Sequence, residues 1–246
     1  MFSPLAFEQT TIITNGLVLN LDASDRTSYP GTGTAWNNIS TGINNGTLTN
    51  GPTFNSGNGG YISFDGVDDF VEFGDVLDLG TNSMTVNSWV YTPSYATQII
   101  FSKAYAGPGN YRYAAGIANN NASTAFVYGF MQGNGGDDVI PWGSGQSIQI
   151  NTWFMATYVF ERSSNISLYI NGSLIFSNRT STISQWNGLN FQSSYPTRVA
   201  AYTAGNGTGI IAPWNGRIGQ FSLYFRALTQ AEISQNFQAT RARFGI

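Results

Sequence analysis

The sequence predicts an all-β fold, a sandwich of two antiparallel sheets with one short helix near the C-terminus. Residues 151–176 (NTWFMATYVFERSSNISLYINGSLIF) alternate apolar and polar positions around a polar turn and an Asn-Gly dipeptide, the pattern of an antiparallel meander. Residues 215–237 (NGRIGQFSLYFRALTQAEISQNF) contain one more strand and then a capping box from Thr229 to Glu232, which predicts the start of a short helix.

The earlier part of the chain supplies the other strands that such a sandwich needs. Residues 29–60 carry many turn-forming dipeptides, and residues 61–73 (YISFDGVDDFVEF) are expected to form two strands around a tight Asp-Gly turn. Strand-like segments recur about every ten residues without helices between them, which favours a sandwich or jelly roll over a parallel α/β sheet. The remaining strands are expected at residues 16–21, 83–92, 98–103, 111–118 and 125–131.

We expect three segments along the chain. Residues 1–14 form an N-terminal arm with apolar side chains at Phe2, Leu5 and Phe7. Residues 15–238 form one jelly-roll domain, and residues 239–246 form a C-terminal tail. A chain of 246 residues is long enough to bury a substantial core in one such domain.

The composition excludes several classes of function. The net charge is -3 and the cations are scattered, so we expect no nucleic-acid partner. No apolar stretch is long enough to cross a membrane, and the N-terminus lacks the basic and apolar regions of an export signal. Cysteine and histidine are both absent, which excludes disulfides, thiolate metal sites and Ser-His hydrolases.

Three segments carry a resemblance to a known family. Residues 16–38 (GLVLNLDASDRTSYPGTGTAWNN), 44–54 (NNGTLTNGPTF) and 63–74 (SFDGVDDFVEFG) resemble the laminin-G-like, concanavalin A-like jelly rolls. The meander and the strand with its capped helix are similar to the later half of the same family, so the resemblance covers residues 15–238. It implies a concanavalin A-like (laminin-G-like) jelly-roll sandwich. Domains with this opening pattern look like those of tailed-bacteriophage structural proteins, secreted bacterial adhesins and sugar-binding modules, so the fold alone does not give the function.

Six of the thirteen acidic residues gather within one short segment, which raises the question of a metal. Members of the resembling family often carry one calcium ion, which takes six to eight oxygen ligands. The spacing is not that of an EF-hand loop, and a tight turn at Asp65 and Gly66 explains part of the cluster. We therefore expect a structural role for these carboxylates, and a bound calcium ion is the alternative. The six residues are Asp65, Asp68, Asp69, Glu72, Asp75 and Asp78.

A second set of residues has the chemistry of a sugar site. Residues 133–145 (GNGGDDVIPWGSG) combine two carboxylates with a Trp, and residues 107–113 and 203–214 supply further aromatic and polar groups. Sugar sites combine hydrogen-bonding groups with an aromatic face that covers the apolar side of the ring. If these loops converge, the glycan site consists of Asp137, Asp138, Trp142, Tyr111, Arg112 and Trp214. The alternative is that Trp142 and Trp214 seal the rim of the core.

The sequence predicts no enzyme. Retaining glucanases of the resembling family place two carboxylates about 5 Å apart, in a motif such as E-x-D-x-x-E on one strand. None of the four glutamates has such neighbours, and residues three apart on a strand, such as Glu72 and Asp75, face opposite sides. The four glutamates are Glu8, Glu72, Glu161 and Glu232.

The leading hypothesis is a non-enzymatic phage virion surface protein, such as a capsid decoration, head-fibre or tail-associated protein. Its expected partners are other virion proteins or copies of itself, contacted through Phe2, Leu5 and Phe7, together with cell-surface polysaccharide. The protein is then made in the host cytoplasm and displayed on the virion surface. The alternative is a carbohydrate-binding module or adhesin outside a virion, with an extracellular location.

Overall fold

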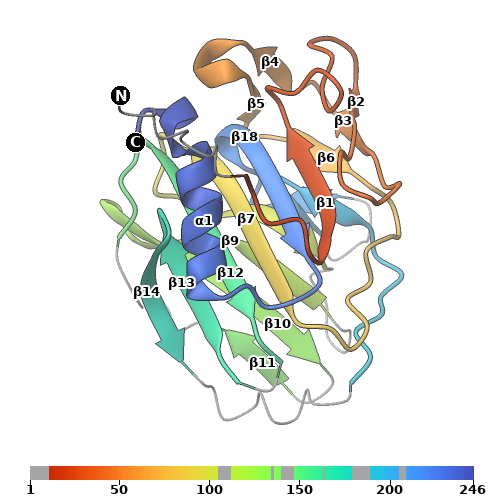
Figure 1. Ribbon diagram of the computed structural model, residues 1–246, viewed down its shortest axis with the longest axis vertical. Coiled ribbons are helices and arrows are strands. Elements are labelled where there is room, and N and C mark those ends of the chain that lie inside the picture. Colours follow the sequence, from red (N-terminus) through yellow and green to blue (C-terminus); the bar gives the residue numbers. More distant parts are fainter. Residues whose placement is uncertain are drawn as a thin grey trace, which may run out of the picture.

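The computed structural model describes residues 11–104, 112–133, 136–139, 147–162, 164–178, 189–204 and 209–246. It confirms the all-β sandwich: two eight-stranded antiparallel sheets pack face to face, with one helix outside them (Figure 1). The first sheet, A, has the order β14 (Ser173–Asn178), β13 (Ile166–Ile170), β12 (Trp153–Phe160), β7 (Met84–Tyr91), β18 (Asn215–Tyr224), β5 (Tyr61–Asp65) and β4 (Thr53–Asn55), and β1 (Leu17–Asp22) also pairs with β18.

The second sheet, B, also has eight strands. Its order is β11 (Gly136–Val139), β10 (Thr124–Gly133), β9 (Arg112–Asn121), β8 (Gln98–Lys103), β15 (Thr197–Val199), β6 (Phe70–Glu72), β3 (Gly46–Thr49) and β2 (Ala35–Trp36). A two-stranded hairpin, β16 (Tyr202–Thr203) and β17 (Ile210–Ile211), follows β15.

Alternation along the strands of sheet B separates a core face from an outer face. The row of residues paired across the sheet at Leu48, Val71, Val199, Phe101 and Ala115 belongs to the buried core between the sheets. Because side chains of successive strand residues point to opposite faces, the neighbouring row lies on the outer face. That row reads Thr47, Glu72, Arg198, Ser102, Ala114 and Phe130.

The predicted meander and helix start are confirmed. Strands β12, β13 and β14 pair in sequence, and Asn171 and Gly172 form the tight turn between the last two with φ of 52° and 76°. Thr229 caps α1 (Gln230–Thr240): its hydroxyl accepts from the Glu232 amide, and the Glu232 carboxylate accepts from the Thr229 amide. This reciprocal pair satisfies two amides that the first helical turn leaves free.

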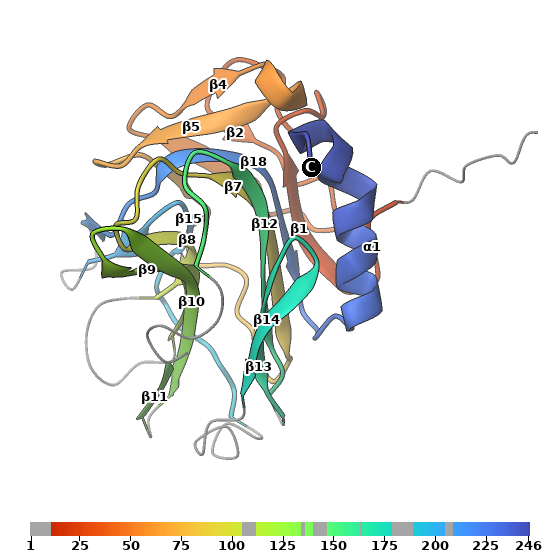
Figure 2. The same cartoon turned by 90° about the vertical axis from the view of Figure 1, so that its left-hand side faces the viewer.

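Helix α1 covers the outer face of sheet A, on the side away from sheet B (Figure 2). Residues 239–246, expected as a tail, complete α1 and continue into a short 3-10 helix, Arg241–Phe244. The Phe244 ring stacks on Trp89 with centroids 4.3 Å apart, and Arg243 pairs with Asp22 at 2.6 Å. These last residues are therefore integral to the domain. None of the helices in the described part of the chain has the length and apolar character needed to cross a bilayer.

Residues 11–14, expected as part of the arm, pack along α1. The Ile13 amide donates to Asn236 Oδ1 at 2.7 Å, and Gln235 Nε2 donates to the Thr11 carbonyl at 2.9 Å. The arm residues Phe2, Leu5 and Phe7 lie outside the described residues.

Candidate functional site

An aromatic stripe on β10 is the main feature of the outer face of sheet B. Phe126, Tyr128 and Phe130 occupy alternate positions, so they share this face. Their partners on β9 are all small: Ala118, Gly116 and Ala114. Phe130 is 9% exposed, and Ala114, Gly116 and Ala118 are buried. Phe126 and Tyr128 are half-buried, so these two rings are the part of the stripe that can contact the apolar face of a flat ligand.

Gly116 lies at the centre of that floor for a steric reason. A Cβ at this position would lie 2.1 Å from the Gln98 carbonyl oxygen on the neighbouring strand. The Gly116 carbonyl accepts a hydrogen bond from the buried Tyr158 hydroxyl at 2.5 Å. A hydrogen bond from sheet A therefore fixes the backbone at Gly116, and Gly116 places no side chain beside Tyr128.

The hairpin β16–β17 forms a wall beside the stripe. The Tyr202 ring lies 5.9 Å from the Phe130 ring, and both belong to a small apolar cluster on this face. Backbone bonds fix the base of the hairpin: the Ala200 amide donates to Ile100 at 2.8 Å, and the Ile99 amide donates to Ala212 at 2.9 Å. The stripe thus lies between an anchored wall and the edge strand β11.

The sequence-predicted site residues reach this region to different degrees. Arg112 on β9 and Asp137 on β11 both pair with Gln132 of β10, one on each side of it. Asp138 pairs with Met131, so Asp137 and Asp138 lie on a strand rather than in the expected loop. Tyr111 and Trp142 lie outside the described residues.

Trp214 has a different place from the one expected. Its side chain is 0% exposed and packs in the main core. The ring is therefore not available to a ligand, and we leave Trp214 out of the site. The glycan role of the other five predicted residues stays a prediction.

The acidic cluster at β5 and β6 has the geometry of a turn. Carboxylate oxygens of Asp65, Asp68 and Asp69 lie within 4.8 Å of one another. Asp65 Oδ1 accepts from the Val67 amide at 2.8 Å and Asp69 Oδ2 accepts from the Asp65 amide at 2.9 Å. Burial, followed by the nearby Asp65 and Asp68 charges, raises the pKa of Asp69. Since two oxygens already serve the backbone, this set does not fit the six to eight ligands that calcium takes, and we derive no step through calcium.

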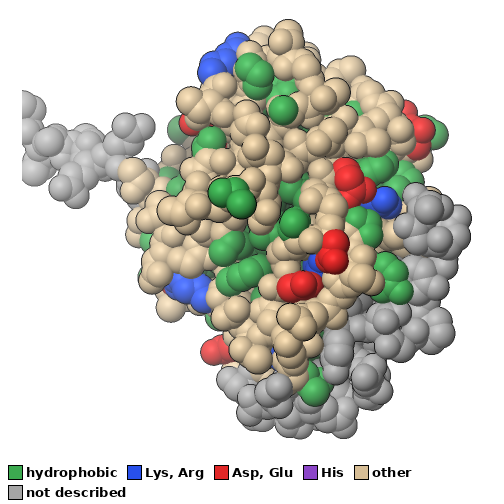
Figure 3. Space-filling view, turned by 90° about the vertical axis from the view of Figure 1, so that its right-hand side faces the viewer, with side chains coloured by type: hydrophobic (Ala, Val, Ile, Leu, Met, Phe, Trp, Pro, Cys, Tyr) green, Lys and Arg blue, Asp and Glu red, His purple; other side chains and the backbone are tan. Residues whose placement is uncertain are grey.

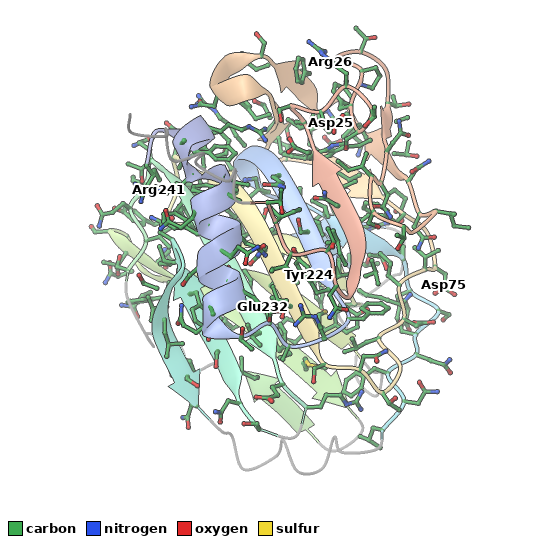
Figure 4. The ribbon with its side chains drawn as sticks, in the orientation of Figure 1. Asp25, Arg26, Asp75, Tyr224, Glu232 and Arg241 are labelled. Carbon is green, nitrogen blue, oxygen red and sulfur yellow. The ribbon has the colours of Figure 1, made fainter. Side chains whose placement is uncertain are left out.

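The other three acidic residues of the segment neutralise buried cations. Lys103 is 1% exposed, and its Nζ contacts Asp75 at 2.8 Å and Asp78 at 3.3 Å. Arg198 pairs with Glu72 at 2.9 Å. Asp75 lies at the right-hand side of Figure 4, and Figure 3 turns that side to the viewer, where acidic side chains gather around basic atoms.

Two of the described glutamates form ion pairs with arginines. Glu72 faces Arg198, as above. Glu232, in the first turn of α1, lies near Tyr224 in Figure 4 and pairs with Arg226 at 2.7 Å. Hydrogen bonding from Arg226 lowers the pKa of Glu232 to about 2. A general acid in glycoside hydrolysis needs a raised pKa, so Glu232 is unsuited to that role.

Two antiparallel sheets with a jelly-roll core and an aromatic outer face define a lectin-like β-sandwich. Residues 65–234 match the concanavalin A-like lectin/glucanases superfamily, and the chain belongs to that family. This confirms the family resemblance read from the sequence. A comparison with curated protein sequences finds no match.

Several solved structures share the fold. The binding domain of Paraclostridial Mosquitocidal Protein 1 is 16% identical, with a TM-score of 0.63 over 91% of this chain and 52% of that one. The binding domain of botulinum neurotoxin serotype D/C is 18% identical, with a TM-score of 0.64 over 92% and 53%. This chain therefore spans about half the length of those two binding domains. Domain 4 of AbnA, a GH43 extracellular arabinanase from Geobacillus stearothermophilus solved with arabinotriose, is 18% identical, with a TM-score of 0.54 over 89% and 97%.

Proposed function

We propose that this chain is a non-enzymatic, lectin-type domain that binds glycan on the outer face of sheet B. The observation that carries this function is the aromatic stripe on β10, in which Phe126 and Tyr128 are half-buried beside small residues of β9 and lie between the β16–β17 hairpin and β11. The apolar face of a sugar ring packs on such rings, while polar groups at the rim bind its hydroxyls. Arg112 and Asp137, which both pair with Gln132, are the rim groups that we assign to the hydroxyls.

Glycan binding is tested by calorimetry and by an array of bacterial surface polysaccharides. Arabinotriose, the ligand of the AbnA domain, is the first defined probe. Replacing Tyr128 by Ala should weaken binding of any glycan found by about tenfold or more, because it removes one stacking face. Tyr91→Ala is the matched control, since Tyr91 lies on sheet A. Equal affinity of the Tyr128 variant and the wild type would overturn this site.

The non-enzymatic part of the proposal has its own assay. Glu72 and Glu232 each form an ion pair with an arginine, and hydrogen bonding from Arg226 lowers the pKa of Glu232, whereas an acid catalyst needs a raised pKa. Incubation with each bound polysaccharide should therefore release no new reducing ends. Release that disappears when a single carboxylate is replaced by its amide would show a hydrolase.

We propose a virion surface as the setting of this binding, with the domain acting as a capsid decoration, head-fibre or tail-associated protein. The support is the resemblance of residues 16–74 to the opening of domains in tailed-phage structural proteins. An extracellular adhesin is the alternative setting. Mass spectrometry and immunogold labelling of purified phage particles distinguish the two: detection on the particle supports a virion protein, and detection only in culture supernatant supports the adhesin.

A further inference from the structure

Two grooves with apolar residues in their walls adjoin beside β1. The first has a volume of about 320 Å³ and the second about 420 Å³, and Thr41 lines both. Both volumes are within the range of small-ligand sites. The apolar residues are Ile12, Leu17 and Ile39 in the first groove and Val18, Ile43, Leu77 and Phe225 in the second.

The loop between the grooves is anchored to β1. The Asn38 side chain makes two hydrogen bonds to this strand: Nδ2 donates to the Val18 carbonyl at 3.0 Å, and Oδ1 accepts from the Asn20 backbone amide at 2.9 Å. The Ile39 amide also donates to the Asn20 carbonyl at 3.0 Å. Because these bonds already occupy the backbone of β1, an occupant of the grooves is held by its side chains rather than by strand addition.

The surface around the grooves is exposed and apolar. Ile43 is 91% exposed, more than any other large hydrophobic residue among those described. Asp78 is the one charged residue among those lining the two grooves. Figure 3 views this side and shows hydrophobic side chains gathered on it. Exposed apolar surface of this kind commonly marks an interaction site.

The chain leaves the described structure at the rim of the first groove. Ile12 and Thr14 line that groove, and the segment that holds them is fixed. The Tyr224 hydroxyl donates to the Ile13 carbonyl at 2.9 Å, in addition to the bonds from α1. Immediately before Thr11 comes the arm, residues 1–10 (MFSPLAFEQT), which carries no cation and three large apolar side chains, Phe2, Leu5 and Phe7.

We propose that the two grooves receive residues 1–10 of a second copy of this chain, so that copies associate by exchanging arms. The arm of the same chain is poorly placed to fill the grooves, because it continues directly from Ile12, which itself lines the first groove. To enter it, the arm would have to reverse direction at residues 8–10, which contain none of the Gly, Pro, Asn or Asp residues that tight turns use. Ten extended residues reach about 33 Å, enough to contact a neighbour. This inference does not depend on glycan binding.

The direct test is a synthetic peptide of residues 1–10, titrated by calorimetry into protein that begins at Thr11. Every described core residue lies after residue 11, so this truncation removes none of them, and circular dichroism checks that the fold is kept. The peptide should bind with one site per domain. Replacing Phe7 with Ala in the peptide should weaken binding about tenfold, since one aromatic anchor is lost. No binding would overturn the proposal.

Variants of the exposed groove residues locate the site. Ile39→Ser and Ile43→Ser together should weaken peptide binding at least tenfold. Val67→Ser is the matched control, because Val67 is also exposed but lines neither groove. If the groove variants and the control bind the peptide equally, the grooves are not the receptor.

Light scattering of the full chain identifies the occupant. Arm exchange predicts dimers or larger assemblies whose mass falls to that of one chain in the truncated protein and in the Ile39/Ile43 double variant. A full chain that stays monomeric up to the highest soluble concentration, while the truncated protein still binds the peptide, would show that each arm fills its own groove. That outcome would overturn exchange between copies.

Discussion

Replacing Phe244 with Ala tests whether the last residues of the chain contribute to the core. The Phe244 side chain is 4% exposed, and its ring lies 4.3 Å from Trp89 and 4.8 Å from Trp153, measured between centroids. Truncation of a buried Phe to Ala typically costs 3–5 kcal/mol. Because the residue is near a chain end that can relax into the cavity, we expect the lower end, about 3 kcal/mol.

Urea unfolding followed by tryptophan fluorescence measures this loss. The midpoint should fall while the slope m stays constant, because the change lowers stability without changing the surface exposed on unfolding. Ile246→Ala is the matched control: it lies two residues further on and is 38% exposed, and it should change stability by less than about 0.5 kcal/mol. A loss below about 1 kcal/mol for the Phe244 variant, with the fold intact, would show that residues 241–246 behave as the tail first expected.

Three further substitutions test other parts of the structure. The pKa of Glu232 is lowered to about 2 in the folded state from 4.5, so its contribution to stability is present above pH 4.5 and is lost as the pH falls toward 2. Because the pair with Arg226 is partly exposed, we expect this contribution to the free energy of unfolding to be about 1 kcal/mol. The loss should be seen when the stability of the wild type is measured as a function of falling pH, and it should be absent in Glu232→Gln. Thr203→Val should raise stability by about 1 kcal/mol in urea unfolding, because the buried Thr203 hydroxyl has no hydrogen-bond partner among the described residues. Gly216→Ala should lower the free energy of unfolding by more than about 2 kcal/mol, since a Cβ at Gly216 would lie 2.0 Å from the Tyr91 carbonyl oxygen. The control is Gly33→Ala, where a Cβ would meet no atom within 4 Å, and its loss should be far smaller. Equal losses for the two variants would contradict the steric account.

Local sequence signals predicted the elements that local physics determines. The turn at Asn171 and Gly172 needs positive φ at both residues, and few residue types provide it. The capping box of Thr229 and Glu232 closes within four residues. Neither feature depends on distant parts of the chain, so both could be read before the fold was known.

The aromatic stripe of the candidate site depends on pairing between strands and was not predicted from the sequence. The alternation of Phe126, Tyr128 and Phe130 is visible in the sequence, but which face of the sandwich it covers depends on the pairing of β10 with β9. The small residues opposite the stripe, and the reason for Gly116, follow from that pairing and from the Gln98 carbonyl. Trp214 follows a Gly-rich segment and lies in a loop just before β18, as expected, but its side chain is buried in the core and its amide donates to the Ala200 carbonyl.

The use of charge in this protein supports recognition by shape and hydrogen bonding. Among the described residues, Lys103, Arg198, Arg226 and Arg243 each pair with a carboxylate that fixes a loop, a strand or a chain end. Pairs of this kind leave little net field to steer a charged ligand over distance. The described part of the aromatic stripe and the two grooves beside β1 are correspondingly almost free of charge. Surfaces with so little charge select ligands by contact area and hydrogen-bond geometry rather than by long-range attraction. The two proposed ligands, an uncharged glycan at the aromatic stripe and an apolar arm in the grooves, are suited to selection of that kind.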